Sequence, residues 1–258
     1  LKHKEVINIP QRAKTDIPGF DKLINGGFPR NFNILLAGGP GTGKSIFSMQ
    51  YLVNGAKKHD EKGLFVSFEQ REEQLRSQAS QFGWDLLALE KSKKLELMYI
   101  PVKKIKKNTI NKIKNYVKKN KVKRLVLDSL STLMINAPIY SNLSDMSLVD
   151  AMSNKTFYSP PIVGEQVVNK FLYEFIDELR DLDCTTILIA EAGQPDKTTG
   201  EVVLGEYACD GVVKINFESL GGEFSRSMII RKMRETNNND DVHPVEIDKK
   251  GFVVHKLE

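Results

Sequence analysis

A phosphate-binding motif occupies residues 38–45, which read Gly-Gly-Pro-Gly-Thr-Gly-Lys-Ser and fit the pattern Gly-x-x-x-x-Gly-Lys-Ser. Glycines let backbone N–H groups turn toward phosphate oxygens without a clash from a Cβ atom. Lys44 is expected to reach the β- and γ-phosphates, and the Ser45 hydroxyl to bind Mg²⁺. A turn that only caps a helix would not need the lysine and serine in register. The motif therefore predicts that a nucleoside triphosphate binds against Gly39, Pro40, Gly41, Thr42, Gly43, Lys44, Ser45 and Ile46.

Two carboxylates could complete the chemistry of a bound triphosphate. Asp128 ends the apolar run Arg124–Asp128 and would hold the Mg²⁺ through a water molecule, as a Walker B aspartate does. Glu69 follows the apolar run Leu64–Phe68, where a carboxylate can polarise the water that attacks the γ-phosphate. A surface glutamate that introduces a helix at Arg71 is the alternative, and the residues alone leave both interpretations of Glu69 open.

The elements that position these residues alternate between strand-like and helix-like segments, which is typical of a mainly parallel sheet covered by helices. The expected strands are Asn33–Ala37, Leu64–Phe68, Leu95–Ile100, Arg124–Asp128 and Thr185–Ala190. The expected helices are Ser45–Ala56, Arg71–Gln81, Thr109–Asn120 and Glu165–Leu182. The phosphate motif lies between the first strand and the first helix, where its chemistry requires it to be.

After Ala190 the segments become short and β-like, which suggests antiparallel strands that extend one edge of the sheet. They are Gly211–Phe217, Ser225–Arg231, Val245–Ile247 and Phe252–His255. The longest irregular stretch runs from Asn136 to Gly164, and loops of that length are usually functional. No linker divides the chain, so we expect residues 1–258 to form a single α/β domain with an insertion at about 136–164.

Composition favours a soluble protein. Charged residues make up 28% of the 258 residues, no apolar run approaches the ~20 residues of a membrane helix, and the start has no hydrophobic signal core, so we expect a cytosolic location without membrane association. Cys184 and Cys209 lack metal-ligand spacing and are expected to be buried thiols. Much of the net charge of +5 lies between Lys103 and Arg124. This lysine face could neutralise nucleic-acid phosphates, but a solvated helix face is the simpler interpretation.

The chain resembles the KaiC-type ATPases of the RecA superfamily. The resemblance is carried by the run Ile17–Arg30 followed by Ala37–Ser45, by Phe68-Glu69-Gln70, by Phe82-Gly83-Trp84-Asp85-Leu86, and by Arg231-Lys232-Met233-Arg234-Glu235-Thr236. It covers nearly the whole chain except residues 136–164. It implies a RecA-like P-loop NTPase core that binds ATP with Mg²⁺ between the subunits of a homo-oligomeric ring, usually a hexamer.

The resemblance also suggests roles for residues beyond the phosphate motif. Glu69 falls on the first of two adjacent acidic residues that serve catalysis in the family, and Gln70 replaces the second, so hydrolysis is expected to be slow or to rely on Glu69 alone. Asn31 stands where the family usually has glycine, and asparagine tolerates left-handed backbone geometry. In the family, residues at the positions of Lys232 and Arg234 reach the γ-phosphate of the neighbouring subunit; the nucleotide-contacting set there is Lys232, Met233, Arg234, Thr236 and Asn238.

Two classes of function remain open. The first is a Mg²⁺-dependent ATPase, regulatory or related to DNA repair, in which Glu69, Lys44, Lys232 and Arg234 act in catalysis. The second is a nucleotide-gated scaffold, or a recombinase paralogue related to archaeal RadA proteins, that binds single-stranded DNA and hydrolyses little ATP. DNA would then contact the loops at 136–164 and Gly193–Glu206. The chain has room for one such domain and shows no counterpart of the adjacent Ser-Thr phosphorylation pair found in the second domain of two-domain clock members of the family, so autokinase and clock functions are not inferred.

Overall fold

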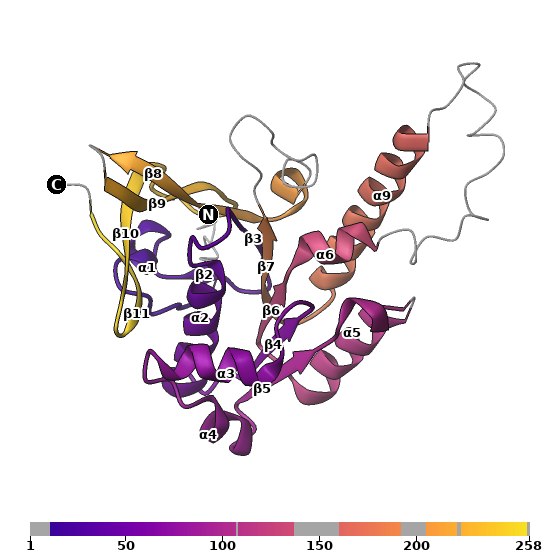
Figure 1. The fold of residues 1–258 in the computed structure, drawn as a ribbon, viewed down its shortest axis with the longest axis horizontal. Coiled ribbons are helices and arrows are strands. Elements are labelled where there is room, and N and C mark those ends of the chain that lie inside the picture. Colours follow the sequence, from indigo (N-terminus) through magenta and orange to yellow (C-terminus); the bar gives the residue numbers. More distant parts are fainter. Residues whose placement is uncertain (1–10, 107, 137–159, 192–204, 221–222, 257–258) are drawn as a thin grey trace, which may run out of the picture.

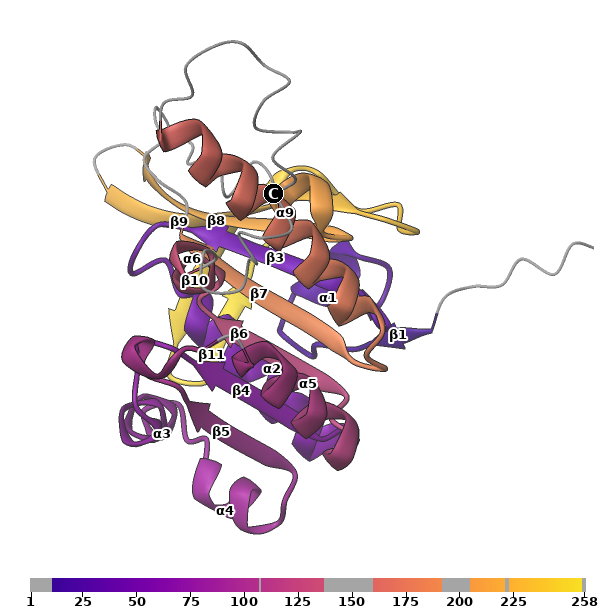
Figure 2. The same ribbon diagram turned by 90° about the vertical axis from the view of Figure 1, so that its right-hand side faces the viewer.

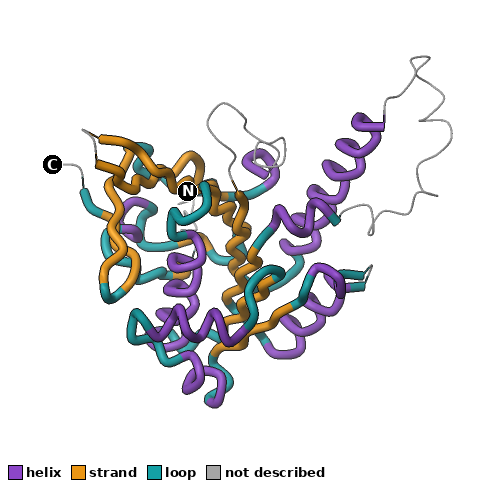
Figure 3. The backbone as a smooth tube through the Cα atoms, in the orientation of Figure 1, coloured by secondary structure: helices purple, strands orange, loops and turns teal. Residues whose placement is uncertain are grey.

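The computed structural model describes residues 11–106, 108–136, 160–191, 205–220 and 223–256. Within these residues a nine-stranded sheet runs through the middle of the molecule, and helices lie on both of its faces (Figures 1 and 3). Its strand order is β11-β10-β9-β8-β3-β7-β6-β4-β5. This confirms the predicted α/β fold, with a mainly parallel sheet and antiparallel C-terminal strands.

The strands near the phosphate motif are all parallel, and most follow their predicted ranges closely. They are β3 (Asn33–Gly38), β4 (Gly63–Ser67), β5 (Leu95–Tyr99), β6 (Arg124–Asp128) and β7 (Thr185–Glu191). Their burial on both faces explains the continuous apolar runs of the sequence.

Three of the four C-terminal strands are longer than predicted, and the first of them pairs differently. They are β8 (Gly211–Leu220), β9 (Glu223–Met233), β10 (Val242–Asp248) and β11 (Gly251–Val254). β9, β10 and β11 are antiparallel to their neighbours as expected, but β8 lies parallel to β3. The residues of a strand do not reveal its direction in the sheet. β8 lies parallel to β3 because the chain reaches it by a crossover connection rather than by a tight turn.

Helices cover the two faces of the sheet in separate groups (Figure 2). One face carries α2 (Lys44–Lys58), α3 (Glu72–Ser80) and α4 (Leu86–Lys91), and the other carries α5 (Thr109–Asn120), α6 (Leu130–Ile135) and α9 (Pro160–Arg180). Each group has its own apolar core against the sheet. Smaller elements are α1 (Phe20–Leu23), a 3₁₀ turn (Val102–Lys104), and a separate antiparallel pair, β1 (Arg12–Ala13) with β2 (Phe28–Pro29).

Three helical features differ from the sequence prediction. α9 begins at Pro160 instead of Glu165, so the irregular stretch that was predicted to run to Gly164 ends before Pro160. Proline is well suited to a first helical turn because it has no N–H that would need a hydrogen-bond partner. The short helices α4 and α6 were missed. The sequence signals each of them only by an N-cap residue, Asp85 for α4 and Ser129 for α6. The side chain of each N-cap residue accepts a hydrogen bond from the backbone N–H three residues later. Residues 137–159 of the predicted insertion lie outside the described residues.

Two smaller expectations, on Asn31 and on the two cysteines, are confirmed. Asn31 adopts the left-handed backbone conformation, with φ of 64°. Cys184 and Cys209 are buried free thiols, and burial raises the pKa of each to about 12. No helix within the described residues is long and apolar enough to cross a membrane.

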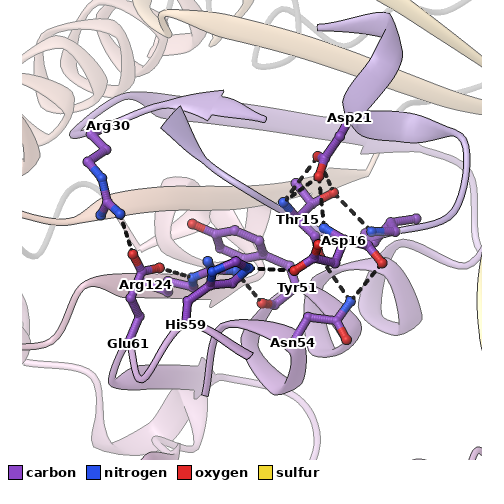
Figure 4. A network of polar contacts seen from close by, with 10 residues as sticks. Thr15, Asp16, Asp21, Arg30, Tyr51, Asn54, His59, Glu61 and Arg124 are labelled. Atoms are coloured by element: carbon purple, nitrogen blue, oxygen red, sulfur yellow. Dashed lines mark hydrogen bonds and ion pairs between the residues drawn. The ribbon is translucent and has the colours of Figure 1, made fainter. Parts of the chain in front are cut away.

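A buried ionic network fastens the end of α2 to the start of β6 (Figure 4). The Arg124 guanidinium is fully buried, donates to Glu61 Oε2 at 2.6 Å and to the Tyr51 carbonyl at 2.9 Å, and stacks 4.5 Å from the centre of the Tyr51 ring. Glu61 also pairs with Arg30. Although burial acts to raise it, these two arginines hold the pKa of Glu61 below its ordinary value.

A second set of contacts in Figure 4 ties the segment before α1 to the same helix. Asp21 accepts hydrogen bonds from the backbone N–H groups of Thr15 and Asp16, and Asn54 donates to both of their carbonyl oxygens. His59 pairs with Asp16. The helix that begins at the phosphate motif is therefore anchored through its middle and C-terminal turns.

Replacing Gly55 by alanine is expected to destabilise the protein, although the same change in most helices stabilises by about 1 kcal/mol. A Cβ at Gly55 would lie 2.3 Å from Arg124 Nε, and the hydrogen bonds of Arg124 hold that side chain in place. We expect a loss of about 2 kcal/mol in the free energy of unfolding, measured by urea denaturation. The clash predicts that Gly55→Ala costs much less in an Arg124→Met background. Equal costs in both backgrounds would contradict it.

Candidate functional site

The loop between β3 and α2 forms a cradle of backbone N–H groups. Gly41 and Gly43 have φ of 74° and 102°, and a Cβ at Gly43 would lie 2.7 Å from Ile247 Cδ1. Within the described residues, the N–H groups of Gly41, Thr42 and Gly43 donate to no other group. Unpaired N–H groups at the positive end of a fifteen-residue helix are an anion site.

The lysine and serine of the motif lie at the mouth of this cradle. Lys44 Nζ donates to the carbonyl oxygens of Gly38 at 2.8 Å and Gly39 at 2.7 Å, and burial lowers its pKa. Ser45 Oγ donates to Asp128 Oδ2 at 2.8 Å. The structure thus brings together the residues predicted to hold phosphate and metal, from the ends of β3 and β6.

A Mg²⁺ ion fits the pair formed by Ser45 and Asp128. Both supply oxygen atoms, and Mg²⁺ is usually held by one or two protein oxygens, with phosphates and waters as its other ligands. Burial raises the pKa of Asp128 to about 6, against the hydrogen bond from Ser45, so a nearby cation would favour the charged carboxylate. Within the described residues, no group of three or more His, Cys, Asp or Glu could enclose a metal.

Glu69 lies close to this pair and is held by two hydroxyl groups. Glu69 Oε1 accepts from Ser129 Oγ at 2.9 Å and from Thr132 Oγ1 at 2.8 Å. The Glu69 side chain is exposed, whereas Ser129, the neighbour of Asp128, is buried. These contacts favour a positioned carboxylate over a freely solvated surface glutamate. The adjacent Gln70 is half-buried, and its side-chain oxygen has no partner within the described residues.

An apolar depression opens beside the first turn of α2. It lies between α2 and α3. Phe82 and Trp84 stack on each other there, with ring centres 4.9 Å apart. The lining consists of Ser45, Ile46, Met49, Leu75, Gln78, Ala79, Phe82 and Trp84. A flat aromatic ligand joined to phosphates at Ser45 would meet an apolar wall here.

The second group of predicted site residues lies at the opposite end of the sheet. Lys232 pairs with Val212, which pairs with Leu35, whereas the phosphate loop starts after Gly38. Three residues of strand separate the two rows, which is roughly 10 Å along the strand. The structure therefore does not bring Lys232 and Arg234 to the phosphate loop of their own chain.

Contacts within the chain hold both cations in place. Lys232 Nζ donates to the carbonyl oxygens of Glu206 and Cys209, at 3.0 and 2.7 Å, and Arg234 Nη1 donates to Asp210 Oδ1 at 2.8 Å. Burial, followed by repulsion from Arg234, lowers the pKa of Lys232.

The other members of that predicted set are engaged differently. The Met233 side chain is 4% exposed and packs in the core, so only its backbone can meet a ligand. Thr236 Oγ1 accepts from Arg12 Nη1 at 2.6 Å. Asn238 Nδ2 donates to the Ile230 carbonyl at 3.0 Å. These contacts fix the turn that follows β9.

Sequence reasoning missed several residues of the site. Ser129 follows Asp128 directly and Thr132 comes three residues later, so their spacing after a strand-end carboxylate was a usable signal. Phe82 and Trp84 were noted only as part of a resemblance. Arg226 gave no signal: its guanidinium stacks 4.8 Å from the centre of the Phe217 ring and donates weakly to the Gly41 carbonyl at 3.3 Å, a contact between β9 and the phosphate loop that depends on strand pairing.

Most of the chain matches a known protein family. A family model described as "ATPase: KaiC" matches residues 13–157 and 148–258, which together span most of the chain. The chain belongs to the KaiC family of ATPases. This membership accounts for the nucleotide-binding cradle and confirms the resemblance carried by the sequence motifs.

Related proteins cover nearly the same length. A UPF0273 protein of Aeropyrum pernix is 32% identical over 95% of this chain and 93% of its own, and one of Thermotoga maritima is 28% identical over 96% and 97%. The crystal structure of a KaiC-like protein from Pyrococcus horikoshii superposes with a TM-score of 0.77 at 32% identity. It covers 96% of this chain and 100% of that one.

Proposed function

We propose that this KaiC-family protein hydrolyses ATP with Mg²⁺ at the interfaces of a homo-oligomeric ring, in which each site takes its phosphate loop from one subunit and its cations from the next. One observation carries the proposal: Lys232 and Arg234 lie at the far end of β3 from the loop that would need them. A cation delivered from a neighbour would stabilise the charge of the transition state and make turnover depend on assembly. Sedimentation combined with phosphate-release assays tests this, since activity per subunit should fall on dilution below the assembly range.

In the proposed mechanism each residue of the site has a separate task. The N–H groups of the loop and Lys44 bind the phosphates, and Ser45 and Asp128 hold Mg²⁺, which would neutralise phosphate charge. Glu69 orients the attacking water and accepts its proton. Because Gln70 follows Glu69 at the position where the family has a second acidic residue, turnover is expected to be slow.

The broader assignments are part of the same proposal. We infer a single ATPase domain over residues 1–258, a hexameric ring and a cytoplasmic location, with a regulatory or DNA-repair role. These rest on family membership and on the absence of a membrane-spanning helix within the described residues. The alternative is a nucleotide-gated scaffold that binds single-stranded DNA through its central loops. Residues 137–159 and 192–204 of those loops lie outside the described residues.

ATP binding is expected to change the fluorescence of Trp84, the only tryptophan of the chain. Trp84 lines the depression beside Ser45, where we propose that the adenine base packs against Phe82. A saturable change should appear on titration with ATP, and Phe82→Ala should weaken binding about tenfold, since stacking of a base on an aromatic ring contributes about 1–3 kcal/mol. Tyr173→Ala, an exposed aromatic on α9, is the matched control. An unchanged affinity in Phe82→Ala would place the base elsewhere.

Removing the two hydroxyls that hold Glu69 is expected to slow hydrolysis without weakening ATP binding. Ser129→Ala with Thr132→Val should lower kcat about tenfold at constant KM, because the carboxylate keeps its charge but loses its orientation. In a Glu69→Gln background the same pair should cause no further loss, since residues acting through one group are not additive. An additional tenfold loss there would show that the hydroxyls act independently of Glu69.

A further inference from the structure

Three short segments together carry a net positive charge that is larger than the net charge of the whole chain. Residues 57–62, 91–94 and 118–124 contain ten lysines and Arg124, against only Asp60 and Glu61. Their net charge is +9, whereas the whole chain carries +5, so all remaining residues together carry −4. We call the ten lysines the basic edge: Lys57, Lys58, Lys62, Lys91, Lys93, Lys94, Lys118, Lys119, Lys121 and Lys123.

The fold gathers these segments on one edge of the sheet. They lead into β4, β5 and β6, three neighbouring parallel strands, and the first residues of these strands, Gly63, Leu95 and Arg124, lie in one row. The backbone joins the segments directly, because Gly63 N–H donates to the Lys94 carbonyl and Lys123 N–H to the Lys62 carbonyl. In Figure 2 the arrowheads of β4 and β5 point left, and the basic edge lies on the opposite side.

Helices on both faces of the sheet contribute to the basic edge. Lys57 and Lys58 end α2 on one face, and Lys118 and Lys119 end α5 on the other. Lysine at a helix C-terminus interacts favourably with the helix dipole, which accounts for one or two cations per helix but not for those beyond the helix ends. The lysines thus surround the strand ends from two sides.

Most of this charge is unpaired. Lys94 pairs with Asp60 at 2.8 Å, and Lys123 pairs with Asp183. Within the described residues the other eight lysines form no ion pair, and seven of them are exposed: Lys57, Lys58, Lys91, Lys93, Lys118, Lys119 and Lys121. Clustered like charges repel and oppose folding, so an external polyanion would relieve the repulsion.

We propose that the basic edge binds the phosphate backbone of duplex nucleic acid without reading its sequence. Ten lysines around three strand ends match a ligand with closely spaced charges, and release of its counterions would drive binding. No large exposed apolar side chain lies on the three segments, so they offer neither a platform for stacking unpaired bases nor an anchor in a lipid bilayer. The surface lies at the opposite ends of the strands from the phosphate loop and is independent of ATP hydrolysis.

Fluorescence anisotropy with a labelled 30-base-pair DNA duplex tests the proposal, with the full chain and no nucleotide. Binding should weaken steeply between 50 and 200 mM salt. The triple variant Lys58→Gln/Lys91→Gln/Lys119→Gln, with one change in each segment, should bind about tenfold more weakly, and its salt slope should fall by about one unit per lost phosphate contact. The control Lys103→Gln/Lys104→Gln/Lys250→Gln removes the same charge elsewhere and should bind like the parent. Thermal unfolding of both variants excludes loss of fold.

Three results would overturn the proposal. They are equal weakening by the triple variant and its control, binding of single-stranded DNA of the same length in preference to the duplex, and binding of phosphatidylserine vesicles but not DNA. Because no nucleotide is present, none of them bears on ATP hydrolysis, and a failure of the ATPase proposal would leave the duplex result standing.

Discussion

Replacing Glu69 by glutamine is expected to lower ATP turnover about 10²–10³-fold while leaving ATP affinity nearly unchanged. The amide keeps the size of the side chain and still accepts hydrogen bonds from Ser129 and Thr132, but it cannot take a proton from water. Phosphate release measures turnover, and the fluorescence of Trp84 measures binding. The variant therefore separates catalysis from the phosphate cradle.

Glu73→Gln is the matched control for this prediction. Glu73 is exposed in the first turn of α3, four residues after Glu69, so the change removes the same charge nearby without touching the site. It should leave turnover within about twofold of the parent. If Glu69→Gln also retained full turnover, Glu69 would be a surface residue and the enzyme proposal would lose its base.

The second large effect is expected at Arg234. Arg234→Ala should reduce turnover about 10³-fold, the usual magnitude for an arginine supplied to a phosphoryl transition state. Folding should be preserved, because Asp210 keeps its contacts with Arg180 and with the backbone N–H of Asn33. Arg231→Ala, an exposed arginine of β9 three residues before Arg234, is the control and should retain turnover. Similar turnover in both variants would contradict a role for Arg234.

The contacts of Arg234 bear on the proposal that it acts across a subunit interface. Arg234 is bound by Asp210, whose carboxylate also accepts from Arg180, so the cation is already oriented within its own chain. Lys232 is similarly satisfied by backbone carbonyls. A preorganised cation costs little ordering entropy when a phosphate approaches it.

Sequence reasoning recovered the parts of this protein that depend on local patterns. The phosphate motif, the strand that ends at Asp128 and the helix over 109–120 are each encoded by contiguous residues, and the structure confirms them. Contacts between segments that are distant in the sequence could not be predicted. The parallel direction of β8, the approach of Ser129 to Glu69 and the contact of Arg226 with Gly41 each depend on strands that only the sheet brings together.

The basic edge also depends on segments that are distant in the sequence. The sequence revealed a lysine-rich stretch between Lys103 and Arg124, and we interpreted it as the outward face of one helix. Six of its ten lysines come instead from the two segments before β4 and β5, at residues 57–62 and 91–94, and Lys103 and Lys104 lie beyond the end of β5. The order of the parallel strands, which the sequence does not state, turns scattered lysines into one surface.

The proposal that each ATP site is shared between subunits is tested most directly by mixing two inactive variants. Lys44→Ala cannot hold the phosphates, and Arg234→Ala cannot supply the cation, so each alone should be inactive. In randomly mixed rings about one interface in four pairs an intact phosphate loop with an intact Arg234 of the neighbour, and about a quarter of the parental turnover should return. If the mixture stays inactive although the subunits co-assemble, Arg234 does not act across the interface and the proposal is wrong.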